Sequence, residues 1–253
     1  MARLNWLPVV AFFLAWEALA RSGWFSAFML PAASTVARRI GNDALSGELA
    51  LHLGLTLYRS LVGFLIAGAL GITLGLLMTR VRAVRWFFDP LISVGFPMPK
   101  IVFLPVVTLW LGFQDTSKII MIVFDAAFPV VAATLAGARA VEKELVWSAR
   151  SLGAGEHSLV REIVFPAALP QILTGLQVAL PIALIVCVVA EMLTGGRGLG
   201  GAMLSASRMA DSPGVFAGIV EIAVAGYVLI KGLALVRSRL LVWHAEALPP
   251  ATV

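Results

Sequence analysis

Charged residues stand inside long apolar stretches of this sequence, among them Arg59, Lys100, Asp125 and Glu191. Where such a stretch crosses a bilayer, an ionised side chain at its centre costs about 2.5–3.5 kcal/mol on insertion scales. The residue is tolerated when it lines a polar pathway for a charged solute, or when it pairs with an opposite charge on a neighbouring helix. Arg59 and Lys100 would suit an anionic solute, and Glu191 a cation or a zwitterion. The sequence leaves pathway and pairing open.

Other reactive chemistry is missing from the sequence. There is no G-x-x-x-x-G-K-[ST] loop to cradle the phosphates of a nucleotide, and neither H-E-x-x-H nor G-x-S-x-G occurs. The three histidines, His52, His157 and His244, are far apart in the sequence, and the single cysteine, Cys187, lies in an apolar run. We therefore expect neither enzyme activity nor a metal site in this chain.

The composition indicates what surrounds these charges. Hydrophobic residues make up 60% of the chain and charged residues 13%, with a mean hydropathy of +0.96, against roughly 45–50% and 25% in soluble domains. So few charged residues cannot cover a soluble protein of 253 residues, whereas a bilayer needs no polar surface. The net charge of +5 is scattered between apolar runs, which argues against nucleic-acid binding.

A transmembrane helix needs about 20 mostly apolar residues. Six stretches reach that length: 6–24, 56–79, 87–112, 118–138, 172–195 and 214–236. We predict an all-α, polytopic membrane protein of about six transmembrane helices in a single domain, 1–253. The stretch 87–112 is the weakest, because four prolines and Lys100 interrupt it. It is predicted to be a broken helix beside a pathway, or a short membrane-surface helix that leads into a span starting near Ile101.

Positive charge predicts the orientation, because it prefers the cytoplasmic side. A cytoplasmic N-terminus places ten cations inside: Arg3, Arg80, Arg82, Arg85, Arg139, Lys143, Arg150, Arg161, Arg237 and Arg239. It leaves six outside: Arg21, Arg38, Arg39, Lys118, Arg197 and Arg208. The triplet Ala18-Leu19-Ala20 is similar to a signal-peptide cleavage site, but the adjacent Glu17 and the apolar stretches that follow favour a retained helix.

Glycines in the second stretch predict close helix packing. Gly71 and Gly75 form a G-x-x-x-G face, and Gly63 lies two turns before it. This face is interpreted as a packing surface and not as a ligand site. It would pack within one subunit or across a dimer.

The longest predicted cytoplasmic connection, about 139–171, has a helical pattern of its own. Leu145 and Ala149 fall on one helix face, a glycine break follows at 153–155, and a second apolar stripe runs to Pro166, which is expected to end it. Two short amphipathic helices around a glycine turn could dock in a groove of a partner protein. An idle hairpin on the membrane surface would show the same pattern.

At this loop the sequence resembles the binding-protein-dependent ABC importer permeases. Their cytoplasmic signature is Glu-Ala-Ala, three residues, Gly, nine residues and Ile-x-Leu-Pro, and this chain reads WSARSLGAGEHSLVREIVFP. The positions that match at the family's spacing are Ala149, Gly153, Ile163 and Pro166. The family's Glu, Ala and Leu are replaced by Trp147, Ser148 and Phe165. Glu144, one turn earlier, is a possible substitute for the lost acid.

Further matches are similar to the nitrate, sulfonate and taurine branch of that family. They are spread over the chain from about residue 50 onward: Arg59, Gly63-Phe64, Asp89-Pro90, Leu104-Pro105, Ser117-Lys118, Phe128-Pro129, Ala190-Glu191 and Gly198-Leu199-Gly200. The resemblance implies a type I importer permease that acts as a homodimer in the bacterial inner membrane. It also implies delivery of a small, mainly anionic solute such as a sulfonate, taurine or nitrate by an extracytoplasmic substrate-binding protein.

The resemblance further implies two separate ATP-binding ABC subunits that dock on the loop. The loop residues concerned are Glu144, Ser148, Ala149, Gly153, Gly155, Ile163 and Pro166. ATP and Mg²⁺ would be bound by these partners, so no cofactor is expected in this chain. An ATP-independent secondary transporter or channel is the alternative function, and a membrane-embedded enzyme or assembly factor is a weaker one.

Overall fold

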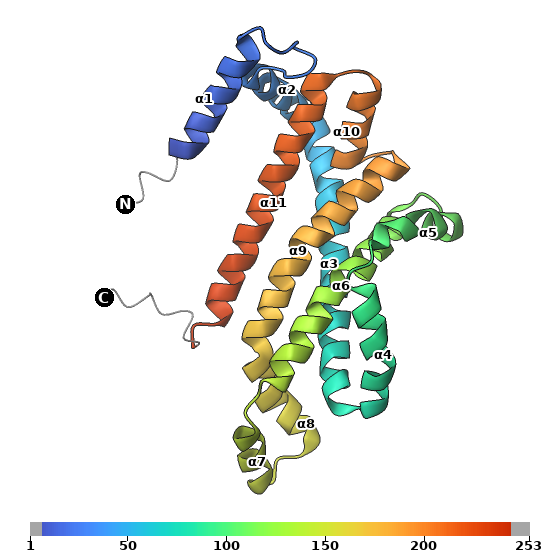
Figure 1. Cartoon of the computed structure of the whole chain (residues 1–253), viewed down its shortest axis with the longest axis vertical. Helices are drawn as coiled ribbons and strands as arrows, with labels where there is room; N and C mark the ends of the chain where they lie inside the picture. Colours follow the sequence, from blue (N-terminus) through green and yellow to red (C-terminus); the bar gives the residue numbers. More distant parts are fainter. Residues whose placement is uncertain (1–6, 244–253) are drawn as a thin grey trace. The chain divides into compact units, whose positions relative to one another are not determined.

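The computed structural model describes residues 7–243, and the regular structure in that range is entirely helical (Figure 1). The elements in chain order are α1 (Leu7–Arg21), α2 (Ala33–Ser46), α3 (Glu48–Arg80), α4 (Arg82–Gly95), η1 (Lys100–Phe103), α5 (Leu104–Leu111), α6 (Asp115–Arg139), α7 (Lys143–Ser151), α8 (Glu156–Ser158), η2 (Leu159–Val164), α9 (Phe165–Thr194), α10 (Leu199–Arg208) and α11 (Ser212–Leu240). The chain divides into two compact units, residues up to Tyr58 with Val188–Gly226, and Arg59–Cys187 with the residues from Tyr227 onward.

Four helices among residues 7–243 are long and apolar enough to cross a membrane: α3, α6, the continuous helix Glu156–Thr194, and α11. A fifth span results if α4 and the pair η1–α5 are counted together, although they are bent by 98°. These elements coincide with five of the six predicted stretches, and the all-α, polytopic prediction is confirmed. The stretch 6–24 contains α1, whose described part is 15 residues long.

In the second unit, α6 is packed closely between α3 and α9. A Cβ atom on Gly71 would lie 2.7 Å from Cβ of Val130, and one on Gly75 would lie 2.6 Å from Cβ of Thr134. Gly175 of α9 leaves the same kind of space for α6 on its other side. The G-x-x-x-G face therefore packs within the subunit, because only residues without a side chain allow the helix backbones to approach this closely.

The break after α4 is the main irregularity of the second unit. Pro97 and Pro99 lack the backbone N–H that a continuing helix needs, so the chain turns and resumes as the 3-10 helix η1 and the short helix α5. Pro90, by contrast, is accommodated within α4. The stretch 87–112 is therefore broken, as predicted, and its second piece begins at Lys100 with η1. Whether both pieces lie within the membrane, or α4 lies on its surface, stays a prediction.

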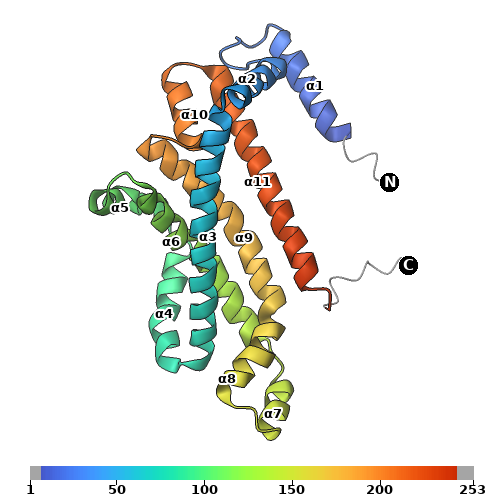
Figure 2. The same ribbon diagram turned by 180° about the vertical axis from the view of Figure 1, so that it is seen from behind.

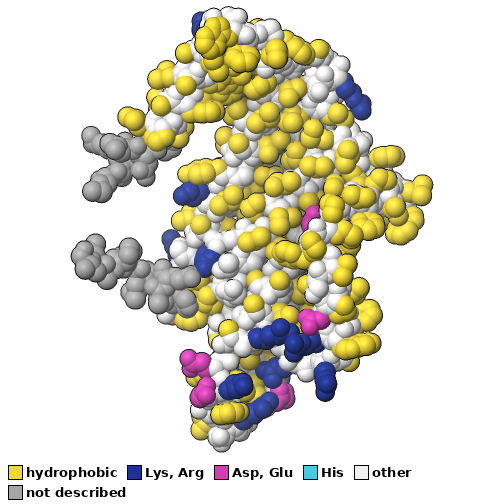
Figure 3. All heavy atoms as spheres, in the orientation of Figure 1, with side chains coloured by type: hydrophobic (Ala, Val, Ile, Leu, Met, Phe, Trp, Pro, Cys, Tyr) yellow, Lys and Arg dark blue, Asp and Glu magenta, His cyan; other side chains and the backbone are white. Residues whose placement is uncertain are grey.

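Exposed apolar side chains line the long helices of the second unit, for example Leu65 on α3, which is 65% exposed, and Ile185 on α9, which is 61% exposed. A water-soluble surface would not carry so many large apolar residues, whereas lipid chains cover them without cost. Figure 3 shows hydrophobic side chains over most of the visible surface. The helices thus keep one face for each other and one for the bilayer.

Candidate functional site

The connection between α6 and α9 forms a small helical projection at the ends of these two helices (Figures 1 and 2). After α7 the backbone reverses at Gly153, whose φ of +88° is a left-handed conformation. There the N–H groups of Gly153 and Ala154 donate to the carbonyls of Arg150 and Ala149, which satisfies the end of the helix. A residue with a Cβ atom would adopt this conformation at a cost of about 1–2 kcal/mol.

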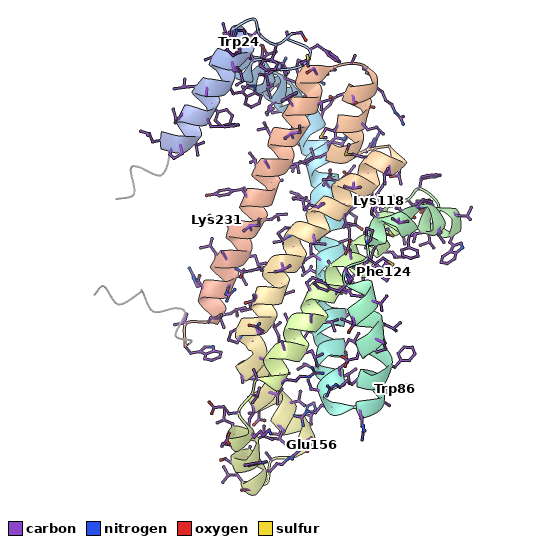
Figure 4. The ribbon with its side chains drawn as sticks, viewed as in Figure 1. Trp24, Trp86, Lys118, Phe124, Glu156 and Lys231 are labelled. Carbon is purple, nitrogen blue, oxygen red and sulfur yellow. The ribbon has the colours of Figure 1, made fainter. Side chains whose placement is uncertain are left out.

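An ion-pair network joins the projection to α3. Glu156, at the start of α8, accepts from Arg80 at the end of α3, with 2.6 Å between Oε2 and Nη1. Its other oxygen accepts from Arg150 of α7 at 2.7 Å. Figure 4 shows Glu156 on the projection. Its carboxylate therefore links α8 to α7 and to the end of a membrane span. The network is solvent-exposed, so its geometry can change at small cost.

The second half of the projection differs from the prediction. The helix does not end at Pro166, because α8, the π-helical turn η2 and α9 form one helix from Glu156 to Thr194. Pro166 is the second residue of α9, directly after η2, where the π-helical turn already interrupts the i→i−4 hydrogen bonds, so its missing N–H does not end the helix. Leu159 and Val164 of η2 are buried, so the base of the projection is packed firmly.

Large apolar side chains on both sides of α7, and Leu152 directly after it, are exposed within residues 7–243. Leu145 is 49% exposed, Trp147 60% and Leu152 89%, while Ser148 and Glu144 are also at the surface. Glu144 has no hydrogen-bond partner in this range, so the structure gives it no replacement contact for the acid that the loop lacks. Among the remaining loop residues, Gly155 is exposed, and Ala149, Ile163 and Pro166 are partly buried.

Lys100 and Asp125 form an ion pair at the break between α4 and α5. Nζ of Lys100 lies 3.0 Å from Oδ1 of Asp125, and the lysine side chain is 3% exposed. The same amine donates to the carbonyl of Met98 at 3.3 Å and lies 4.4 Å from the ring centroid of Phe128. Lys100 thus satisfies a carbonyl of the break and holds the break against α6.

Arg59 pairs with Asp115, a residue that the sequence did not single out. Nη2 and Nε of Arg59 lie 2.6 and 2.8 Å from Oδ1 of Asp115. Asp115 is the first residue of α6, where the positive end of the helix dipole also favours a carboxylate. The Arg59 side chain is 5% exposed and that of Asp115 is 46% exposed, so this pair extends from the packed interior to the surface.

Glu191 belongs to a buried hydrogen-bond network in the first unit. Its carboxylate accepts from Oγ1 of Thr56 at 2.9 Å and from the N–H of Gly200 at 3.0 Å. Thr56 Oγ1 in turn accepts from the N–H of Leu199 at 2.9 Å. Both Glu191 and Thr56 are fully buried. Together they satisfy N–H groups at the beginning of α10, where a helix has no internal acceptors.

The glycines around α10 are required by this network. Gly198 has a φ of +132°, and a Cβ atom there would overlap the carboxylate of Glu191. A Cβ atom on Gly200 would overlap the carbonyl oxygen of Val188. His52, which lies on α3 because this helix begins earlier than predicted, accepts from the N–H of Gly198 through Nδ1 at 3.0 Å. The motif Gly198-Leu199-Gly200 therefore fits closely around one carboxylate.

A second charged cluster in the first unit surrounds Arg39. Its guanidinium binds Asp43 at 2.9 Å and Asp211 at 2.5 Å, and the hydrogen bond that it donates to Asp43 raises the pKa of Arg39 above its ordinary value. Beside it lies a cavity of about 50 Å³ that His52 and Glu221 also line. Because Arg39 is already paired with two carboxylates, this cavity gives an anion no unshared cation.

The partners that the sequence did not reveal are distant along the chain. Thr56 and Glu191 are 135 residues apart, Arg80 and Glu156 are 76 apart, and Arg59 and Asp115 are 56 apart. No local pattern indicates such pairs. For Asp125 the sequence leaves two interpretations open, a pathway residue or an ion-pair partner, and its pairing with Lys100 corresponds to the second.

Comparison with known proteins gives a consistent assignment. Residues 69–242 match the model of the family described as binding-protein-dependent transport system inner membrane component. A Bacillus subtilis permease named for aliphatic sulfonates transport, SsuC, is 34% identical over 94% of this chain and 86% of its own length. The taurine transport system permease protein TauC of Escherichia coli is 35% identical over 77% of this chain and 71% of its own length.

A solved structure has the same fold. The crystal structure of an amino acid ABC transporter with histidines superimposes with a TM-score of 0.62, at 18% identity, over 79% of this chain and 95% of that chain. At this identity the likeness concerns the arrangement of the helices.

Proposed function

Because this chain belongs to the family of binding-protein-dependent transport system inner membrane components, we propose that it is the subunit through which an ATP-driven importer moves a small sulfonate. The relatives that share about a third of its residues are transport permeases, and the chain is a multi-pass membrane permease and not an enzyme. ATP and Mg²⁺ are bound by separate ATPase subunits, two to each permease homodimer, and an extracytoplasmic protein delivers the solute.

The observation that carries this proposal is the projection formed by α7, α8 and η2. Its large apolar side chains Leu145, Trp147 and Leu152 are exposed, as expected for a part of the chain that a partner covers. It continues directly into α9 and is bound through Glu156 to the end of α3. A movement of the docked ATPase would therefore be transmitted to two membrane spans at once.

We infer alternating access as the mechanism. When two ATPases close on ATP, the projection moves with them, and α3, α6 and α9 reorient around the pathway. The tight glycine contacts between α6 and its two neighbours make these helices move as packed elements, because a close-packed interface transmits displacement. The exposed ion pairs of Glu156 allow the projection itself to change angle.

The intramembrane charges support this pathway in different ways. Lys100 and Asp125 hold the break of the bent span, and Arg59 with Asp115 fixes the beginning of α6. Glu191 holds the start of α10. We propose that Arg59 and Lys100 contribute positive potential toward an anionic solute while each remains paired, and that Asp125 and Glu191 act by positioning their partners.

The solute is inferred from the relatives, whose names concern aliphatic sulfonates and taurine. A sulfonate is a compact, permanent anion, and the net charge of +5 on the chain is compatible with it. The orientation follows from the positive-inside rule, with the N-terminus and the projection in the cytoplasm.

The proposal is tested by co-purification and reconstitution. The tagged protein is isolated from its native membrane, its bound chains are identified, and the complex is placed in liposomes with ATP and Mg²⁺ on the projection side. We expect a Walker-type ATPase in the preparation and vanadate-sensitive uptake of taurine or ethanesulfonate that requires the binding protein. Uptake by the permease alone without ATP would establish the secondary-transporter function instead.

A further inference from the structure

An apolar groove lies beside α4 in the second unit. It has a volume of about 410 Å³ and is bounded by α3, α4, the break after α4, and α6, within the range of about 300–1,000 Å³ that is usual for ligand sites. Its wall includes Leu74, Phe88, Leu91, Met98, Phe124 and Phe128, and none of its lining residues is polar. Leu91 is 51% exposed and Val94 71%, so the groove is open along α4.

A basic turn precedes this groove on the same helix. Three arginines, Arg80, Arg82 and Arg85, lie within six residues where α3 passes into α4. Figure 3 shows Lys and Arg side chains gathered in this region. Arg80 is occupied by Glu156, but Arg82 has no ion-pair partner in residues 7–243, and Arg85 is 3.7 Å from Asp89 with both side chains about half exposed. Two arginines can thus accept an external anion.

Aromatic residues mark the same turn as a membrane boundary. Trp86 is 80% exposed and Phe87 57% exposed, and Trp86 extends away from the helix bundle (Figure 4). Tryptophan is enriched where lipid headgroups meet the hydrocarbon region. The arginines are therefore at headgroup level, and the groove begins about 4.5 Å farther along α4, since Phe88, the first residue of its wall on this helix, follows Arg85 by three residues at about 1.5 Å each.

We propose that the basic turn and the groove together form a site for one anionic phospholipid. Arg82 and Arg85 bind the headgroup phosphates, and one acyl chain lies in the groove against Phe124 and Phe128. That the lipid belongs to the cytoplasmic leaflet rests on the orientation proposed above. A zwitterionic lipid would fill the groove equally but would gain less from the two arginines, so the site discriminates by headgroup charge.

The charges favour a lipid over a second copy of the chain. A symmetric partner seated on the groove would bring its own arginine-rich turn or other parts of a chain with net charge +5 to Arg82 and Arg85. A lipid satisfies both the apolar groove and the arginines. Occupied in this way, the groove would also support the break at Met98, because the acyl chain fills the space on one side of it.

The test is native mass spectrometry of the purified permease complex titrated with phosphatidylglycerol or phosphatidylcholine of matched chains. We expect one molecule of phosphatidylglycerol to bind to each permease chain, and to bind more tightly than phosphatidylcholine. The double variant Arg82→Gln and Arg85→Gln should bind it about 30-fold more weakly, or about 2 kcal/mol at 1.4 kcal/mol per tenfold. Arg38→Gln, which removes an exposed arginine from α2 in the other unit, is the matched control and should leave affinity unchanged.

Two further arms examine the groove itself. Ala127→Phe, which narrows the groove, should weaken the binding of long-chain phosphatidylglycerol but leave the binding of a short-chain form and of inorganic phosphate unchanged. A monodisperse preparation would show that the variant is folded. A photoactivatable acyl chain should label residues of α4 or α6 at the groove. Equal binding by all variants, affinity independent of chain length, or cross-linking of the groove to a second copy of the chain would each overturn the proposal.

Discussion

Two glutamates of this protein bind their partners in opposite surroundings. Glu191 is fully buried and accepts from a hydroxyl and a backbone N–H that have no water to replace it. Glu156 is 66% exposed and binds two arginines that water can also solvate. A buried acceptor is costly to remove, whereas an exposed ion pair contributes little to stability. The first therefore suits a fixed part of a transporter, and the second suits a part that moves.

The largest effect on stability is expected for Glu191→Ala. The hydroxyl of Thr56 and the N–H of Gly200 lose their acceptor in a buried site, which costs about 1–3 kcal/mol for each unsatisfied group. The melting temperature in detergent and the amount of protein in the membrane should both fall. Glu191→Gln keeps one carbonyl acceptor and should lose clearly less stability than Glu191→Ala. An equal fall in melting temperature for the two variants would contradict the hydrogen-bond account.

Lys100→Met should have the next largest effect. It leaves Asp125 without its cation, and removing one member of a buried pair usually costs about 3–5 kcal/mol, although the 22% exposure of Asp125 lowers this to about 2 kcal/mol. The double variant Lys100→Met with Asp125→Leu should recover most of the stability. Thermal unfolding of the four proteins of this cycle measures the coupling, and additive losses would show that the pair does not hold the break.

Gly153→Pro tests the turn of the projection. Proline requires a φ near −65°, while Gly153 has +88°, so the turn must change its path. Because the turn is exposed, we expect the melting temperature to fall by only a few degrees, whereas ATP-dependent uptake should fall about tenfold or more if the turn positions the projection. Normal uptake by this variant would show that transport does not require this turn conformation.

The smallest effect on stability is expected for Glu156→Gln. The amide weakens two exposed ion pairs, which together contribute less than about 1 kcal/mol. If these pairs link the projection to α3, the number of solute molecules moved per ATP hydrolysed should nevertheless fall. Arg150→Gln removes only the link to α7 and is the matched control. If the number of solute molecules moved per ATP is the same in the Glu156 variant, the Arg150 variant and the natural protein, the pair of Arg80 and Glu156 has no coupling role.

Much of this architecture is predictable from the sequence, because lipid burial imposes a simple requirement on length and polarity. The spans represented by α3, α6, α9 and α11 follow from apolar runs, and the broken helix follows from Pro97 and Pro99. The continuation of the helix through Pro166 is not predictable from the sequence, since it depends on the π-helical turn before it.

The charged residues show where prediction from sequence ends. That Arg59, Lys100, Asp125 and Glu191 need partners follows from the cost of buried charge. Which partners they have depends on helix register and on distant segments. Asp115 is outside the apolar stretch that was predicted for α6, and Thr56 is a neutral residue with no pattern that marks it as an acceptor and donor for the start of α10.

The most direct test of the coupling claim is Ala149→Glu in the reconstituted importer, with solute uptake and ATP hydrolysis measured in the same liposomes. Ala149 lies on the helix of the projection that we propose to dock on the ATPase, and the substitution places a charge there without altering a membrane span. We predict a permease that stays folded in the membrane but loses ATP-dependent uptake. Undiminished uptake that still requires ATP would contradict docking at this helix, and uptake without ATP would contradict the importer function itself.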